Sequence, residues 1–180
     1  MLRRKLSISA SALSASVIDV LARARGGELT ELQLRYERFG GLAASKALAA
    51  ALGPKVRSVD LRHNGLGEAG GRRVAQALRQ GSGLRDLDLR ANGLRDSGVA
   101  AVAALLHGTT CPPLQDLNLW NNSISADGAR RLASALRKNR RLETLNLGQN
   151  SLEDAGAIEV ALALVAHPSL AALNLREAYI

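Results

Sequence analysis

The side chains best placed for chemistry in this chain are carboxylates, guanidinium groups and one indole that alternate with apolar residues. Residues 58–62 read S-V-D-L-R, residues 86–90 read D-L-D-L-R and residues 116–120 read D-L-N-L-W. In an extended strand such alternation buries one face and leaves the other in solvent. Arg and Trp most often anchor protein contacts. The sequence therefore predicts a polar recognition surface that contains Asp60, Arg62, Asp86, Asp88, Arg90, Asp116, Asn118 and Trp120, with His63 and Asn121 at its rim.

A glycine motif at 65–70 has the spacing G-x-G-x-x-G, which is typical of dinucleotide-binding turns. Gly65 and Gly70 recur as Gly93 and Gly98, however, so an internal repeat explains them without a ligand. The repeat is also shorter than the βαβ unit in which a ribose-binding acid follows about 20 residues later, and Leu89 and Arg90 stand near that place. We therefore reject a nucleotide site.

Catalytic and metal-binding patterns are absent from the sequence. The chain has one cysteine and three histidines, which are too scattered for metal-ligand spacing. Cys111 precedes Pro112-Pro113, and no histidine is placed to activate it. We expect no enzyme activity, no cofactor and no metal.

The formal net charge is +8, yet the pattern of basic residues does not indicate a nucleic-acid protein. Predicted helical faces carry Arg72, Arg73 and Arg79, and again Arg130, Arg131, Arg137, Lys138, Arg140 and Arg141. The helix between them breaks this stripe with Ala100, Ala101 and His107, and aromatic residues for base stacking are lacking. A solvated helix face explains these residues, so no specific nucleic acid is expected. No apolar run is long enough to span a membrane.

The polar residues are positioned by an internal repeat of the form L-x-x-L-x-L-x-x-N-x-L. Leu84, Leu87, Leu89, Asn92 and Leu94 make up one complete copy. Glu37 replaces the asparagine in the first copy, and the asparagine is expected to bond the turn that follows it. Copies start at 29, 56, 84, 114 and 142, and a partial copy starts at 170.

Four copies continue with a glycine, at Gly70, Gly98, Gly128 and Gly156, and with a helix whose apolar residues share one face, as in Val74-Ala75-x-Ala77-Leu78 and Val102-Ala103-x-Leu105-Leu106. Strands about 4.8 Å apart beside helices that need roughly 8–10 Å force the stack to bend. The predicted fold is a right-handed α/β solenoid, with parallel strands on the concave face and helices on the convex face.

Alignment of the copies predicts three columns of side chains that point away from the core on the concave face. The first is Glu31, Ser58, Asp86, Asp116, Thr144 and Ala172; the second is Gln33, Asp60, Asp88, Asn118, Asn146 and Asn174; the third is Arg35, Arg62, Arg90, Trp120, Gly148 and Arg176.

The repeat over 29–175 resembles the ribonuclease-inhibitor class of leucine-rich repeats, which includes ribonuclease inhibitor, NOD-like receptor repeats and Ran GTPase-activating protein. The resemblance implies a non-catalytic module or scaffold that binds a protein on its concave face, such as a fragment of a longer NOD-like-receptor-type protein. The alternative is a GTPase-activating regulator resembling Ran GTPase-activating protein. Such a regulator usually has a strongly acidic tail, whereas this chain is basic.

The two ends depart from the repeat. Residues 1–28 are predicted to be a degenerate capping repeat, with Leu6, Ile8, Leu13, Leu21, Ala22 and Ala24 near repeat positions; a basic, Ser-rich targeting segment for mitochondria is the alternative. Otherwise we expect a cytoplasmic protein. Near the other end, Ile158, Leu162 and Val165 occupy helix positions that are polar in other copies. We expect them to be exposed, as in a fragment of a longer array.

Overall fold

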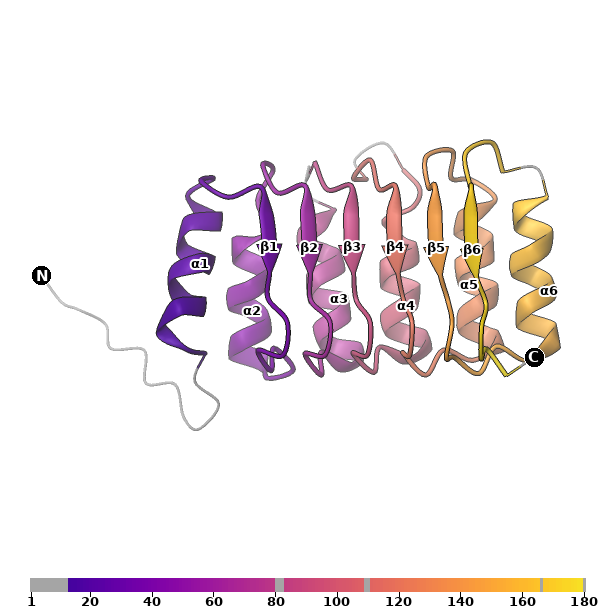
Figure 1. Cartoon of the computed structure of the whole chain (residues 1–180), viewed down its shortest axis with the longest axis horizontal. Coiled ribbons are helices and arrows are strands. Elements are labelled where there is room, and N and C mark those ends of the chain that lie inside the picture. The colour runs from indigo at the N-terminus through magenta and orange to yellow at the C-terminus, as the bar shows by residue number, and fades with distance from the viewer. Residues whose placement is uncertain (1–12, 80–82, 109–110, 166, 180) are drawn as a thin grey trace, which may run out of the picture.

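The computed structural model describes residues 13–79, 83–108, 111–165 and 167–179. Strands of three residues alternate with helices along the chain (Figure 1). In chain order the elements are α1 (Ala15–Arg25), β1 (Glu31–Gln33), α2 (Leu42–Ala51), β2 (Ser58–Asp60), α3 (Gly67–Leu78), β3 (Asp86–Asp88), α4 (Arg95–Ala103), β4 (Asp116–Asn118), α5 (Ala126–Leu136), β5 (Thr144–Asn146), α6 (Glu153–Leu164) and β6 (Ala172–Asn174).

The six strands form one parallel sheet in the order of the sequence. Asp86 of β3 pairs with Ser58 of β2 on one side and with Asp116 of β4 on the other. The same register continues to both edges and confirms the predicted alignment of the first two columns. The chain runs along a strand, returns through the helix behind it and advances by one repeat, which makes a right-handed solenoid (Figure 1).

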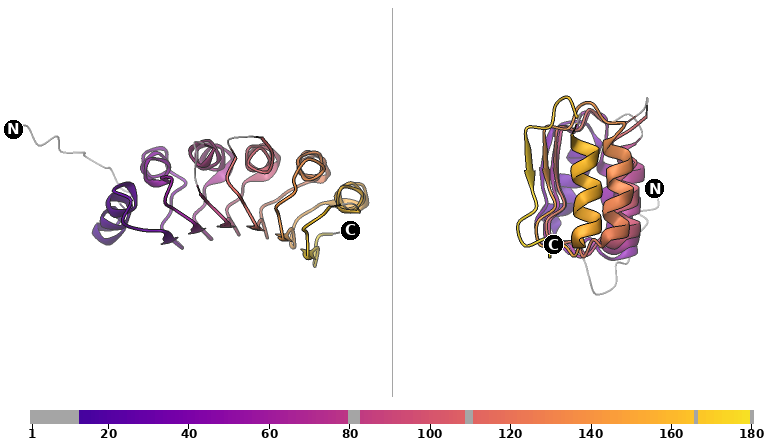
Figure 2. Two further views of the ribbon diagram at one scale, coloured as in Figure 1. Left: turned by 90° about the horizontal axis from the view of Figure 1, so that it is seen from above. Right: turned by 90° about the vertical axis from the view of Figure 1, so that its right-hand side faces the viewer.

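The solenoid is a shallow arc in which the helices occupy the outer, convex side and the strands the inner, concave side (Figure 2). In the left view of Figure 2 the helices are spread further apart than the strands below them. This agrees with the expected origin of the curvature, because helices require more lateral space than paired strands. The fold class predicted from the repeat is confirmed.

Leucines from strands and turns fill the space between the two layers. Leu87 and Leu89 of one repeat are 2% and 0% exposed, and the equivalent positions of the other inner repeats are buried as well. Burial of a leucine contributes roughly 1.5–3 kcal/mol relative to exposure. Identical layers of this kind give a continuous core, although the chain has few aromatic residues.

The repeated asparagines Asn64, Asn92, Asn122 and Asn150 form a buried ladder along the turns. The side-chain amide of Asn92 donates to the carbonyl of Leu89 in its own repeat and to that of Leu61 in the preceding one. Its Oδ1 accepts from the backbone N–H of Asn64, 28 residues earlier. The predicted bonds to the following turn are therefore wrong: each asparagine secures its own strand end and the previous turn. Glu37 lacks this amide, but its N–H still donates to Asn64 Oδ1.

Three helices end earlier than the sequence pattern predicts. Leu105 and Leu106 are buried, but they follow the end of α4 at Ala103. Basic residues assigned to helical faces also fall in the connections that lead to the next strand, because α3 ends at Leu78 and α5 at Leu136. These residues are Arg79, Arg137, Lys138, Arg140 and Arg141.

At the first repeat, α1 packs beside α2 and buries Val17, Leu21 and Ala24, while Ala22 is exposed. Leu6 and Ile8 lie outside the described residues. In α6 and just after it, Ile158, Leu162 and Val165 are 56%, 59% and 82% exposed, as predicted. None of the helices in the described part of the chain is sufficiently long and apolar to cross a membrane.

Candidate functional site

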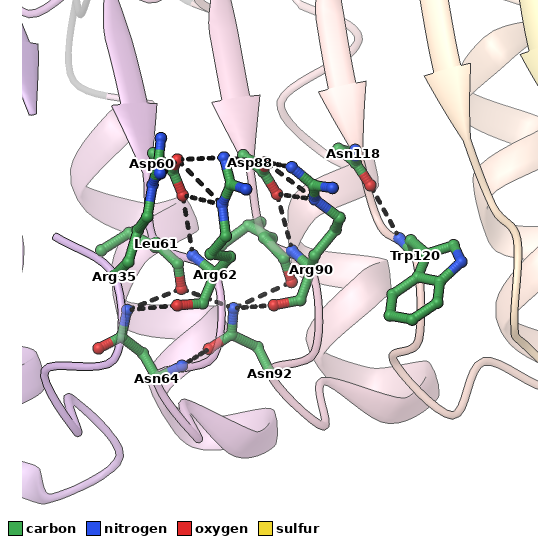
Figure 3. A network of polar contacts seen from close by, with 11 residues as sticks. Arg35, Asp60, Leu61, Arg62, Asn64, Asp88, Arg90, Asn92, Asn118 and Trp120 are labelled. Carbon is green, nitrogen blue, oxygen red and sulfur yellow. Dashed lines mark hydrogen bonds and ion pairs between the residues drawn. The ribbon is translucent and has the colours of Figure 1, made fainter. Parts of the chain in front are cut away.

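The concave face holds an open hollow of about 500 Å³ that extends across all six strands. Its floor consists of the first two predicted columns, because alternate residues of each short strand point away from the core. Every predicted site residue on a strand lines this hollow, namely Asp60, Asp86, Asp88, Asp116 and Asn118. Arg62, Arg90 and Trp120 follow two residues after the second column and stand at its border (Figure 3).

Asp60 and Asp88 are neutralised within the site by arginines of the third column (Figure 3). Asp60 Oδ2 lies 2.6 Å from Arg62 Nη2 and 2.6 Å from Arg35 Nε. Arg62 also lies 3.6 Å from Asp88, and Arg90 Nη2 lies 2.7 Å from the same carboxylate. The network links three repeats. Arg35 was not among the predicted site residues, although its place in the third column signals it.

The second column also has a structural role that the sequence analysis missed. The backbone N–H of Arg62 donates to Asp60 Oδ1, and that of Trp120 donates to Asn118 Oδ1 at 3.1 Å. The same bond recurs two residues after Asp88, Asn146 and Asn174. A short Asp or Asn side chain is suited to this local bond. It ends each strand and fixes the backbone from which the third column projects.

The two groups of carboxylates in the hollow have opposite electrostatic environments. Burial raises the pKa of Asp60, but hydrogen bonds from Arg62 and Arg35 outweigh burial and hold this pKa below its ordinary value. Burial also raises the pKa of Asp86, and the nearby Asp116 carboxyl raises it further. Thr144 Oγ1 donates to Asp116. In the described part of the chain, Glu31, Asp86 and Asp116 have no cation in ion-pair contact, so the first column is acidic.

We expect Asp60→Asn and Asp86→Asn to change stability in opposite directions near neutral pH. The pKa of Asp60 is lowered, so its contribution is present above the ordinary carboxyl pKa and is lost as the pH falls through the folded-state value. The pKa of Asp86 is raised, so its contribution is present in acid and is lost as the pH rises. Asp60→Asn should lower, and Asp86→Asn should raise, the free energy of unfolding by up to about 1 kcal/mol, because solvent screens both sites.

Urea denaturation across the acidic to neutral range measures this difference. The effect of each substitution should fade as the pH falls into the carboxyl range, because the native carboxyl is then protonated and neutral like the amide. A change of the same sign for both variants near neutral pH would contradict the assigned environments.

Trp120 is half-buried, whereas its column position predicted an open side chain. A Cβ built on Gly148, the next residue of the third column, would lie 2.9 Å from Trp120 Cδ1. The glycine in the neighbouring repeat therefore leaves room for the indole to lie over it. The packed indole is held in place and still borders the site (Figure 3), which suits a contact residue.

His63 and Asn121, which the sequence placed at the rim of the site, are both exposed. His63 stacks on Tyr36, with ring centroids 4.7 Å apart. Tyr36 was not among the predicted site residues, because the pattern of the repeat contains no signal for a stack between neighbouring turns.

The structure thus separates the predicted residues into three groups. Asp60, Arg62, Asp88 and Arg90 form one ion network, Asp86 and Asp116 form an acidic pair, and Asn118 and Trp120 are joined by a backbone bond. Among the residues that the structure describes, no group of three His, Cys, Asp or Glu side chains could hold a metal ion. The geometry is that of a preorganised polar surface with both charge signs.

Comparison with known proteins gives one family and one fold. A family model described as Leucine Rich repeat matches residues 54–75, 84–103, 110–133 and 138–161, which together are half of the chain. No curated protein matches. Among solved structures, the actin-binding site 2 of leiomodin-1 is similar, with a TM-score of 0.52, 18% identity, and coverage of 91% of this chain and 80% of that one. This likeness is one of fold.

Proposed function

Because this chain belongs to the leucine-rich repeat family, we propose that it is a binding module for another protein and that the concave face is its contact surface. Solenoids present long curved surfaces that suit recognition. The leiomodin-1 structure is titled an actin-binding site, which supports the use of this fold in protein contacts. The likeness does not extend to actin as the partner here.

The observation that carries this proposal is the ion network of Arg35, Asp60, Arg62, Asp88 and Arg90. Its arginines are already held in position, so a partner would immobilise few additional side chains on binding. Arg62 is 25% and Arg90 33% exposed, which leaves part of each guanidinium open to a partner's carboxylates or aromatic rings. The Asp86–Asp116 pair beside them would accept a lysine or an arginine. We therefore propose a partner with both charge signs on its contact surface.

The test compares the natural chain with the triple variant Arg62→Ala, Arg90→Ala, Trp120→Ala in affinity capture from a lysate of the source organism. We expect one protein to be retained by the natural chain and lost by the variant. With that protein purified, the dissociation constant should rise at least roughly tenfold, as is usual when interface arginines and tryptophans are removed.

A matched control removes two arginines and one large apolar side chain from the convex side, as Arg130→Ala, Arg131→Ala, Leu162→Ala. All three side chains are exposed, so the control changes charge and apolar surface without altering the concave face. Equal capture by the natural chain, the triple variant and the control would reject the concave face as the site. Circular dichroism of each variant excludes unfolding as the cause.

Two more specific proposals, a module like NOD-like receptor repeats and a GTPase-activating regulator, are distinguished by the identity of the captured protein. Capture of a regulatory or signalling protein supports the likeness to NOD-like receptor repeats. Capture of a small GTPase, together with faster GTP hydrolysis on addition of this chain, supports the alternative that resembles Ran GTPase-activating protein.

A further inference from the structure

The net positive charge of the described chain is concentrated along one edge of the solenoid. Residues 1–12 hold three of the 24 Lys and Arg and none of the 16 Asp and Glu, so the described residues carry +5. The connections that lead from each helix to the next strand lie along one edge (top in Figure 1) and carry +6. All other described residues together carry −1. We name as the basic edge the Lys and Arg residues of these connections that have no ion pair in the described part of the chain. They are Lys55, Arg57, Arg79, Arg85, Lys138, Arg140 and Arg141.

Cations on the helices differ from those of the connections, because four of the eight on the helices have an ion pair among the described residues. Arg72 and Arg95 pair with Glu68, and Arg130 pairs with Asp127. A solvated helical face would show this pattern of local pairing. Of the eight cations in the connections, only Arg137 has an ion pair among the described residues, with Glu159, so the seven cations of the basic edge are available to a ligand.

Part of the basic edge also lines two hollows in the surface. Arg85, Arg140 and Arg141 line a hollow of about 290 Å³, and Arg140 and Arg141 also line a neighbouring one of about 240 Å³ with Lys138. Glu143 lines the first hollow, but its Oε1 already accepts from Gln115 Nε2 at 2.6 Å. Arg57 is positioned by its bond to the carbonyl of Pro54.

We propose that the basic edge binds an extended, acidic segment of a protein. Guanidinium groups bind carboxylates through paired hydrogen bonds, and five of the seven cations are arginines. These connections contain no Phe, Tyr or Trp on which nucleic-acid bases could stack. Arg57 and Arg85 directly precede β2 and β3, so the edge borders the concave face. One partner can therefore occupy both surfaces, but binding to the edge does not depend on the concave site.

The test uses fluorescence anisotropy of a fluorescein-labelled oligoglutamate peptide with the full chain at low salt. The edge variant is Arg85→Gln, Arg140→Gln, Arg141→Gln. The control variant, Arg72→Gln, Arg130→Gln, Arg131→Gln, removes the same charge from the helical faces. We expect binding that weakens with salt, a dissociation constant roughly tenfold higher for the edge variant, and a change of less than about twofold for the control.

Three outcomes would overturn the proposal. The first is the absence of binding at low salt. The second is equal weakening by both variants, which would assign the affinity to net charge alone. The third is tighter binding of an oligothymidylate than of the peptide with the same dependence on the edge variant, which would assign the edge to nucleic acid. An unchanged melting temperature of the edge variant excludes loss of folding as the cause. The peptide assay needs no natural partner, so its failure is distinguishable from failure of the concave-site proposal.

Discussion

Asn92→Ala is expected to lower the free energy of unfolding by about 3–5 kcal/mol, because it leaves several buried backbone groups without partners. Asn92 is 1% exposed. Its side-chain amide donates to the carbonyls of Leu61, Leu89 and Arg90, and its Oδ1 accepts from the N–H groups of Asn64 and Leu66. Alanine provides neither donor nor acceptor. Urea denaturation followed by circular dichroism measures the change.

The substitution Asn92→Asp distinguishes the contribution of the Asn92 side chain as a hydrogen-bond donor from its contribution as an acceptor. The aspartate keeps an acceptor for Asn64 and Leu66 but loses the donors, and at neutral pH it places a negative charge beside three carbonyl oxygens. We expect it to destabilise as much as alanine near neutral pH and less in acid, where a protonated carboxyl can donate once.

The control for both variants is Gln76→Ala, which removes an amide from the exposed surface of α3. It should change stability by less than about 0.5 kcal/mol. A loss for Asn92→Ala as small as that of this control would contradict a structural role for the asparagine ladder.

Gly156→Val is expected to lower the free energy of unfolding by about 2–3 kcal/mol, because α6 meets α5 at this residue without room for a side chain. A Cβ at Gly156 would lie 2.9 Å from Ala129 Cβ and 3.0 Å from Ala126 Cα. Neither atom can move by a rotamer change, since one belongs to the backbone and the other to an alanine. The helices must therefore separate or shift along each other.

Gly156→Ala gives the sharper result, because helix propensity and packing predict opposite signs. Alanine is favoured over glycine by about 1 kcal/mol inside an exposed helix. At this contact we expect a net loss of stability. The matched control is Ala155→Val on the exposed neighbouring position, which should cost less than about 1 kcal/mol. A gain in stability for Gly156→Ala would show that α5 and α6 are not in close contact there.

Much of the architecture was predictable because each repeat carries its own local signals. The alternation around Leu87 and Leu89 marks a strand, and the spacing of Val74, Ala75 and Leu78 marks a helix. Repetition then aligns equivalent residues between neighbours, so the strand columns followed directly from the period. The ends of helices were less predictable: Leu105 and Leu106 are buried and apolar whether or not the helix extends to them.

The candidate site was predictable as a set of positions but not as a set of interactions. The prediction of an open Trp120 was wrong, because Gly148 of the neighbouring repeat leaves room for the indole to pack. The Asp60 and Asp86 carboxylates both point away from the core in the repeat pattern, yet one is surrounded by guanidinium groups and the other faces Asp116. Part of this difference arises between repeats, because Arg35 is 25 residues before Asp60 and Asp116 belongs to the repeat after Asp86.

The sequence alone determined the period, the buried leucines, the parallel register and the outward-facing columns, because hydrophobic alternation acts within one repeat and stacking copies it to the next. Only the tertiary structure decided which charges neutralise each other, how Trp120 packs and which cations stay unpaired along the basic edge. Several of these properties depend on distances of a few ångströms between side chains of different repeats, as in the Arg35–Asp60 and Arg62–Asp88 contacts. Coulombic and hydrogen-bond energies change steeply over such distances.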